Sequence, residues 1–376
     1  MSSAHTLSRT VSLSALALLA TAPAMAQDGR RSLDLTIDGV GVSIGDSRGV
    51  TGLRLNFRDT RLERVDGVNA TVWSPIGPAR GTVNGVALGL PVTGAARING
   101  LATAVFGLGA RDGITGVGVA PLGIGAGGDL SGVMVGGLGL GAAGQVSGIS
   151  VGGLGVGSGG GLRGLTVGGL GVGSGGDIAG ISAGGLGVAS AGNLRWVTVA
   201  GLGAGAGGTV HGLTVGGLAV GAGGEVTGIT LAGAGVGAGG RVTGVTIAGL
   251  GVGAGGRVTG VTVAGLGVGA GGQLTGLTIA GAGAGAPMVR GVTVGGLAAG
   301  GADVEGLTFG GLVAGGTEVR GVTLAGAYVR VKDGSLHGGA VSPFNHVRGS
   351  QHGLTIWILN YAEELHGLQI GVLNYA

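Results

Sequence analysis

The sequence predicts an all-β protein, a parallel β-solenoid of about 20 glycine-rich turns of roughly 16 residues each. Three observations lead to this prediction. Glycine makes up 100 of the 376 residues. One Gly recurs at a fixed spacing before an apolar-Thr-apolar triplet, and the phase of the apolar residues changes inside every repeat. Glycine at this level without a period would suggest low complexity, whereas a strict period indicates a repeat fold.

The recurring Gly, here called the landmark glycine, sets the period of the array. Every step between its central members is 16 residues, and Trp196 is the only substitution. Outside this stretch the steps vary between 14 and 18 residues. We therefore expect residues 27–376 to form a single array. The central members are Gly116, Gly132, Gly148, Gly164, Gly180, Trp196, Gly212, Gly228, Gly244, Gly260 and Gly276.

The repeat from Arg241 to Gly256 shows how one turn is expected to fold. Its residues are mostly β-branched or Gly, which disfavours a helix. Val245 and Ile247 lie two apart on one face of a strand, and Leu250 and Val252 lie two apart in the opposite phase. A corner at Ala248–Gly249 would turn both pairs toward one interior. A second corner is expected at the Gly-Gly pair that ends the repeat, where glycine tolerates unusual dihedral angles.

The alternative fold is a transmembrane antiparallel β-barrel with one strand per repeat. Short strands with glycine-rich turns and a high apolar content suit an outer membrane. The change of phase inside each repeat does not match the continuous in-out alternation of a barrel strand, so the solenoid is the preferred prediction.

The first 26 residues have the features of a secretory signal peptide. His5 and Arg9 give a weakly basic start, and an apolar run extends from Val11 to Ala20. Ala24 and Ala26 form a small-x-small cleavage site. We expect export to the periplasm, the outer membrane or the cell surface.

The last repeats carry a more specific motif, G-L-T-I-W-I-L-N-Y from Gly353 and G-L-Q-I-G-V-L-N-Y from Gly367. Residues 353–376 resemble the G-L-Q-I-G-L-x-N repeats of the leptospiral-type surface-repeat family of exported bacterial proteins. The resemblance implies a cell-envelope location and no enzymatic activity. The central repeats carry Gly where that family has Asn.

The middle residue of the triplet is usually Thr, and the phase chosen above places it outside. On stacked turns the hydroxyls would lie about 4.8 Å apart. A regular column of this kind is a candidate ice-binding surface, and the alternative is a β-favoured residue that is compatible with water. The column consists of Thr214, Thr230, Thr246, Thr262, Thr278, Thr293, Thr308 and Thr323, preceded by Thr166 and Thr198.

The sequence predicts no enzyme, no cofactor and no metal site. G-x-G-x-x-G strings such as Gly251–Gly256 occur in nearly every repeat without a following helix. His352 and His366 share a slot, but no third ligand has a clear place beside them. The chain has no Cys, which excludes disulfides and thiolate metal sites. A net charge of +3 without a basic cluster does not favour nucleic-acid binding.

The sequence therefore predicts a non-enzymatic structural or interaction protein of the envelope or surface. An outer-membrane barrel and an ice-binding protein are the alternatives. The expected partner is an unidentified envelope or surface component, and membrane association stays open. The pattern continues to Tyr375 without a polar cap, from which we expect end-to-end self-association.

Overall fold

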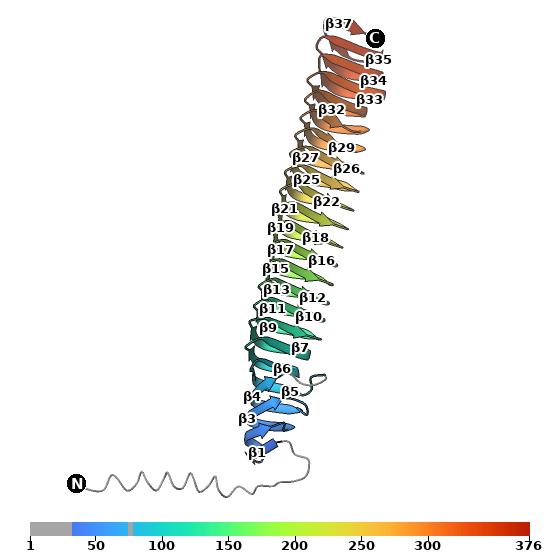
Figure 1. The fold of residues 1–376 in the computed structure, drawn as a ribbon. Coiled ribbons are helices and arrows are strands. Elements are labelled where there is room, and N and C mark those ends of the chain that lie inside the picture. Colours follow the sequence, from blue (N-terminus) through green and yellow to red (C-terminus); the bar gives the residue numbers. More distant parts are fainter. Residues whose placement is uncertain (1–31, 74–77) are drawn as a thin grey trace, which may run out of the picture. The chain divides into compact units, whose positions relative to one another are not determined.

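All regular secondary structure in the described part of the chain is β-strand. The computed structural model describes residues 32–73 and 78–376, and the predicted signal peptide lies outside these residues. The chain divides into two compact units between Gly136 and Gly137. Within each unit the chain coils so that strands of successive turns lie side by side (Figure 1).

The described residues of the first unit form nine strands. They are β1 (Ser32–Ile37), β2 (Val40–Gly45), β3 (Gly49–Arg58), β4 (Arg64–Trp73), β5 (Thr82–Gly89), β6 (Val92–Ala104), β7 (Gly107–Ala120), β8 (Gly123–Ala126) and β9 (Asp129–Gly136). β1 pairs antiparallel with β2, whereas β3, β4, β5 and β6 follow one another in parallel. Only the hairpin of β1 and β2 departs from the parallel order among the described strands of this unit.

The second unit begins with alternating short and long strands. The short strands are β10 (Gly139–Ala142), β12 (Gly155–Ser158), β14 (Gly171–Ser174), β16 (Gly187–Ser190), β18 (Gly203–Ala206), β20 (Ala219–Ala222), β22 (Gly235–Ala238), β24 (Gly251–Ala254), β26 (Gly267–Ala270), β28 (Gly283–Gly285) and β30 (Ala298–Gly300). The long strands are β11 (Gln145–Gly152), β13 (Gly161–Gly168), β15 (Ile178–Gly184), β17 (Leu194–Ala200), β19 (Val210–Gly216), β21 (Val226–Ala232), β23 (Val242–Ala248), β25 (Arg257–Ala264), β27 (Gln273–Ala280), β29 (Met288–Gly295) and β31 (Asp303–Gly310).

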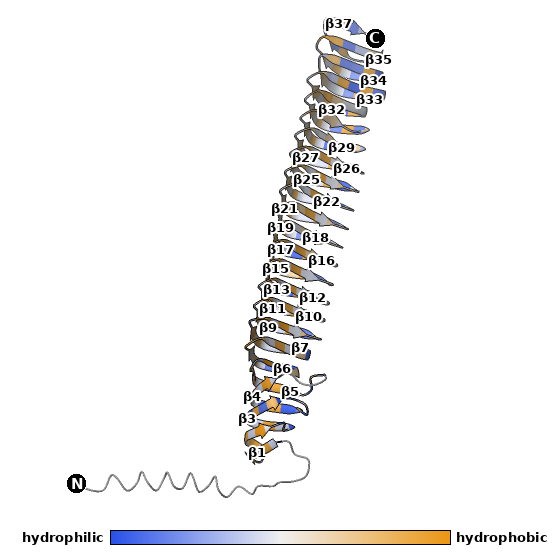
Figure 2. Ribbon diagram, viewed as in Figure 1, coloured by the Kyte–Doolittle hydropathy of each residue, from blue (hydrophilic) through white to orange (hydrophobic). Residues whose placement is uncertain are grey.

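The remaining strands of the second unit begin with three of 13 or 14 residues, in which the short and long strands of one turn merge, and end with three shorter ones. They are β32 (Val313–Ala325), β33 (Tyr328–Val341), β34 (Phe344–Ile356), β35 (Leu359–Leu365), β36 (Leu368–Ile370) and β37 (Leu373–Tyr375). In β32 a register shift between Gly316 and Glu318 lies where the earlier turns have their second bend. Hydrophilic residues gather in β33, β34 and β35 (Figure 2).

The strand register confirms the predicted solenoid. β23 pairs with β25 in parallel and matches Val242 to Val258, and β24 pairs with β26 and matches Gly251 to Gly267. Each residue thus lies beside its equivalent in the next repeat, in a coil of about 20 turns with a 16-residue period. The alternative of one antiparallel strand per repeat is wrong, because neighbouring repeats pair in parallel.

The two bends of each turn depend on glycine. The first bend lies at Gly249–Leu250, one residue later than predicted, and the second at Gly255–Gly256, as predicted. A Cβ at Gly249 would collide with the carbonyl oxygen of Gly233 one turn earlier. The landmark glycine Gly244 has a φ of 112°, a region that L-residues rarely adopt.

The interior of each turn is narrow and differs from the predicted one. Thr246 and Ala248 of β23 point inward, together with Val252 of β24. Val245 and Ile247 were expected inside but are 39% and 45% exposed. Because residues alternate along a strand, the inward position of Thr246 requires both of its neighbours to face outward.

Candidate functional site

The threonine column lies inside the coil, so the prediction of a surface ladder is wrong. Thr246 and Thr262 are each 1% exposed. The residue two places before the landmark glycine, Val242 in this repeat, is buried and has the same parity as Thr246. A buried column cannot contact ice, and the ice-binding alternative loses its basis. The buried members include Thr166, Thr198, Thr214, Thr230, Thr246, Thr262, Thr278, Thr293, Thr308 and Thr323.

An internal hydroxyl column is compatible with a narrow core when the hydroxyls find partners. Ser182 occupies the same slot one turn before Thr198 and donates to its Oγ1 at 3.2 Å. Thr323 Oγ1 is buried and has no hydrogen-bond partner in the described part of the chain. The column therefore contributes to the core through its methyl groups and short side chains, not through contact with solvent.

The residues that flank the threonines form an apolar surface in the second unit, here called the apolar face. The position before Thr provides Ile149, Leu165, Ile181, Leu213, Ile229, Val245, Val261, Val292, Leu307 and Val322 as exposed residues. The position after Thr provides Val199, Leu231, Ile247, Ile279 and Phe309. None of these positions carries a charged residue, so the face is uncharged along the repeat.

A column of leucines at the first bend forms the third column of the apolar face. Leu250 is 54% exposed, although it was expected inside. The backbone N–H of Leu266 donates to the carbonyl oxygen of Leu250 at 2.7 Å, which aligns the leucines of successive turns. We call these residues the corner leucines, and their exposed members in the second unit are Leu138, Leu154, Leu170, Leu186, Leu202, Leu218, Leu250, Leu266, Leu297 and Leu312.

The short strands present almost no side chains to the outside. Gly253 faces outward, and a Cβ built on it would have no atom within 4 Å. Its φ is not positive, so the fold itself does not require glycine there. The same holds for Gly141, Gly157, Gly173, Gly205, Gly221, Gly237 and Gly269. This glycine face is bare backbone on the side of the turn opposite to the threonine strand.

The polar side chains of the central turns gather at the start of the long strands, here called the polar edge. Arg241 pairs with Glu225 one turn away at 2.6 Å, and Arg195 pairs with Asp177 at 3.1 Å. The backbone N–H of Asn193 donates to Asp177 and holds the pKa of this carboxyl group below its usual value. These exposed pairs neutralise the edge and contribute little stability each.

Trp196 replaces the landmark glycine and keeps a positive φ of 87°. Its side chain is 70% exposed. In the equivalent place one turn earlier, a Cβ on Gly180 would collide with the carbonyl oxygen of Gly164. The sequence showed the substitution, but only the backbone angle shows that this residue is held in a strained conformation.

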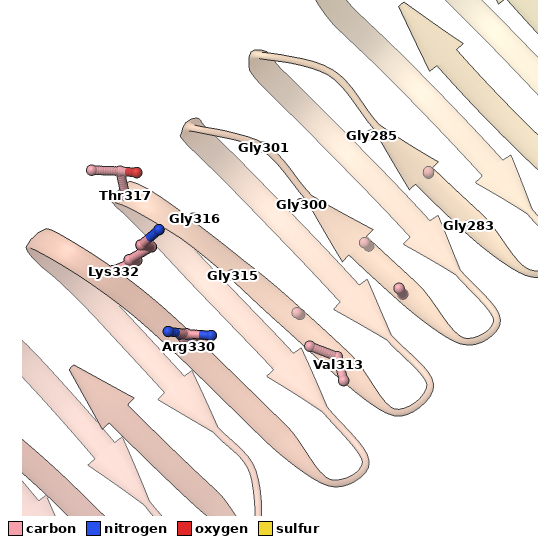
Figure 3. Close-up of a pocket in the computed structure, with 14 residues that line it drawn as sticks. Gly283, Gly285, Gly300, Gly301, Val313, Gly315, Gly316, Thr317, Arg330 and Lys332 are labelled. Atoms are coloured by element: carbon pink, nitrogen blue, oxygen red, sulfur yellow. The ribbon is translucent and has the colours of Figure 1, made fainter. Parts of the chain in front are cut away.

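A shallow depression of about 560 Å³ lies on the glycine face near the C-terminal turns (Figure 3). Its floor is made by small residues such as Gly285 and Gly300, and Arg330 and Lys332 stand at one end. Within the described residues neither cation forms a salt bridge. The depression can attract anionic groups, although its floor offers few side chains to hold them.

The last turns carry ladders of rings. His352 stacks between His337 and His366 with centroid distances of 4.7 and 4.8 Å. Tyr361 stacks on Tyr375 at 5.3 Å. In the described part of the chain no group of three His, Asp or Glu side chains is arranged to hold a metal ion. The sequence predicts that His352 and His366 occupy the same position in successive turns, and in the structure their rings stack on each other.

The first unit contains a buried polar cluster that sequence reasoning missed. Arg54 is fully buried, forms a salt bridge with Asp46 at 3.0 Å and also pairs with Asp59. It donates to Asn69 Oδ1 at 2.9 Å. Burial works against ionisation of Asp46, but hydrogen bonds from Thr60 and the charge of Arg54 hold its pKa below the usual value. With its charges paired, the cluster has a structural role inside the coil.

No protein-family model, no curated protein and no solved structure matches this chain. The resemblance of residues 353–376 to the surface-repeat family therefore stays a prediction. The residues that the structure describes include no helix of the length and hydropathy needed to cross a membrane. The exposed apolar face is the feature of the second unit that most needs a functional explanation, because soluble proteins rarely expose long contiguous apolar patches.

Proposed function

We propose that this chain is a non-enzymatic structural or interaction protein of the bacterial cell envelope or surface that docks through its apolar face. One observation carries the proposal: aliphatic side chains stand outward in three aligned columns of the second unit, with Val245, Ile247 and Leu250 as their members in one turn. A surface of this kind is favourable only when a partner removes it from water.

The chemistry of the other surfaces supports a role without catalysis. The glycine face has hardly any side chains, and several charged residues of the central turns pair across neighbouring turns, as Arg241 does with Glu225. General acid-base or nucleophilic catalysis needs convergent titratable groups in a cleft. The proposed export is supported by the signal-peptide pattern of residues 1–26 and by the resemblance of residues 353–376 to exported surface repeats.

Single cysteines test both the location and the docking, because the native chain has none. Leu250→Cys lies on a corner leucine, and the control Arg257→Cys lies on the polar edge. Cells that produce each variant are treated with a maleimide that does not cross the inner membrane. We expect the control to react and Leu250→Cys to be protected until the protein is denatured. Equal reaction of both sites before denaturation would contradict docking through the apolar face, and reaction of neither site until the inner membrane is opened would contradict export.

A further inference from the structure

The size and spacing of the apolar face of the second unit also indicate which partner covers it. We propose that its occupant is a second copy of this chain, so that two solenoids pair side by side through their apolar faces. This inference rests on the proposed function and names the partner of the same surface. It differs from end-to-end association, which would use the edges of the last strands and leave the apolar face exposed.

The exposed area is large enough for a stable pair. The ten corner leucines alone offer roughly 800 Å², if each half-exposed leucine contributes about 80 Å². This is about the area that each partner buries in a protein interface of ordinary size. The columns of Val245 and Ile247 add to it. A face of this size is therefore sufficient for association without help from the polar edge.

The spacing of the columns favours an identical partner. Residues of one column lie one turn apart in parallel strands, as with Val245 and Val261 in β23 and β25. Neighbouring strands are about 4.8 Å apart. A second copy has the same repeat distance, so the ridges of one face fit the grooves of the other along many turns. A partner with another spacing would lose this match after a few residues.

The charges argue against a lipid surface as the occupant. Proteins that lie on membranes usually combine an apolar face with an excess of Lys and Arg beside it. Between residues 137 and 327 the chain has six Arg, no Lys and five Asp or Glu, so it has almost no net charge. Arg290, for example, is already paired with Glu305 at 3.1 Å. Little electrostatic attraction to anionic lipids remains.

Trp196 gives an independent indication that this side of the coil makes a contact. It directly precedes Val197, which occupies the position before the threonine in the apolar face. Trp196 combines a positive φ with a large exposed ring, whereas the turns on either side have Gly at this position. Strained positions cluster at functional sites, and Trp is enriched at the energetic centres of protein interfaces.

The test measures the mass of the full chain in solution by sedimentation equilibrium across micromolar concentrations. The variant Leu250→Glu with Leu266→Glu places two charges on the apolar face. The matched control, Thr243→Glu with Thr259→Glu, places two charges on the polar edge of the same turns. We expect the wild type and the control to form two-chain particles and the leucine variant to associate at least about 100-fold more weakly. Circular dichroism is used to verify that all three are folded.

The other outcomes overturn the pairing in distinguishable ways. A wild type that stays a single chain contradicts the inference; if Leu250→Cys is nevertheless protected in cells, the proposed function survives with a different partner. Single chains that bind vesicles of neutral phosphatidylcholine would identify lipid as the occupant. Two-chain particles that persist in the leucine variant would show that the copies pair through another surface.

Discussion

At the scale of single residues, the direction of a side chain in this coil depends on its parity relative to the landmark glycine. Thr246 has even parity with Gly244 and points inward, and Val245 has odd parity and points outward. Hydropathy alone would place Val245 inside the coil and Thr246 outside. The buried residue Val242, two places before Gly244, carries the signal that decides the parity, because it is apolar in the central repeats.

Asp substitutions at Thr262 and Val261 should destabilise the coil to very different extents. Thr262→Asp buries a carboxylate without a partner and should destabilise the coil by at least about 3 kcal/mol. Val261→Asp, studied at a dilution where the chain is monomeric, places the same charge in solvent and should cost less than about 1 kcal/mol. Denaturant unfolding followed by circular dichroism measures both. A larger loss for Val261→Asp than for Thr262→Asp would contradict the inward assignment of the threonine column.

Replacement of Trp196 by Gly should stabilise the isolated protein. The substitution restores the residue type of Gly180 and Gly212 at a positive φ and should relieve about 1 kcal/mol of backbone strain. We expect a higher thermal unfolding midpoint under conditions where the chain is monomeric. A lower midpoint would mean that the ring makes stabilising contacts within the coil that outweigh the strain.

At the scale of strands and bends, glycine has two different roles within a single turn. Gly249 at the first bend is required, because a Cβ would collide with Gly233. Gly253 in the short strand is not required by any contact in its surroundings. The short strand therefore tolerates side chains that the bends do not.

The two roles can be separated by alanine substitutions. Gly253→Ala should be neutral or stabilise the coil by up to about 1 kcal/mol, because it restricts the unfolded chain. Gly249→Ala should destabilise it by at least about 2 kcal/mol through the backbone collision. Urea unfolding of the two variants gives the comparison. Equal stability losses would show that the glycine face is also closely packed.

His346 in β34 should make the stability of the C-terminal turns sensitive to pH. Its Nδ1 lies 2.8 Å from the hydroxyl oxygen of Tyr328. Burial, together with Arg330 and Arg348, lowers the pKa of His346 below 6.5 in the folded state. The unfolded chain then binds the proton more readily, so the stability is fully present above the unfolded pKa and falls as the pH decreases toward the folded pKa.

His346→Gln should therefore flatten the fall in thermal stability between neutral and mildly acidic pH. Melting midpoints at a series of pH values, followed by circular dichroism, measure the slope for the wild type and the variant. His211→Gln, at an exposed position of a central turn, serves as the control. An unchanged slope in His346→Gln would contradict the assignment.

The period, the parallel pairing and the second bend at Gly255–Gly256 could be predicted from the sequence, because glycine spacing and local propensity determine them. In the structure the first bend lies one residue later than predicted, and the inward and outward faces of the long strand are the reverse of the predicted ones. An apolar-Thr-apolar triplet fits a strand equally well with Thr facing inward or outward. The interior of each turn is narrow, so it accommodates the small Thr better than Ile. The cluster around Arg54 depends on residues far apart in sequence, which spacing arguments cannot bring together.

At the scale of the whole molecule, the chain consists of two compact units with different contents. The first contains a buried ionic cluster around Arg54, and the second carries the apolar face, the glycine face and the ring ladders. Stability in such coils is approximately the sum of terms between neighbouring turns. Consequently the second unit can keep a repetitive and almost uncharged surface over many turns, which suits association with another regular surface.

The most direct test of the inward threonines and outward leucines is the native-state reaction of single cysteines in the purified chain. We predict that Thr262→Cys reacts slowly with maleimide at every protein concentration and that Arg257→Cys reacts rapidly. Leu266→Cys should react rapidly when the protein is dilute and more slowly as two copies associate. Rapid reaction of Thr262→Cys in the folded chain, or slow reaction of Leu266→Cys at every dilution, would contradict this account.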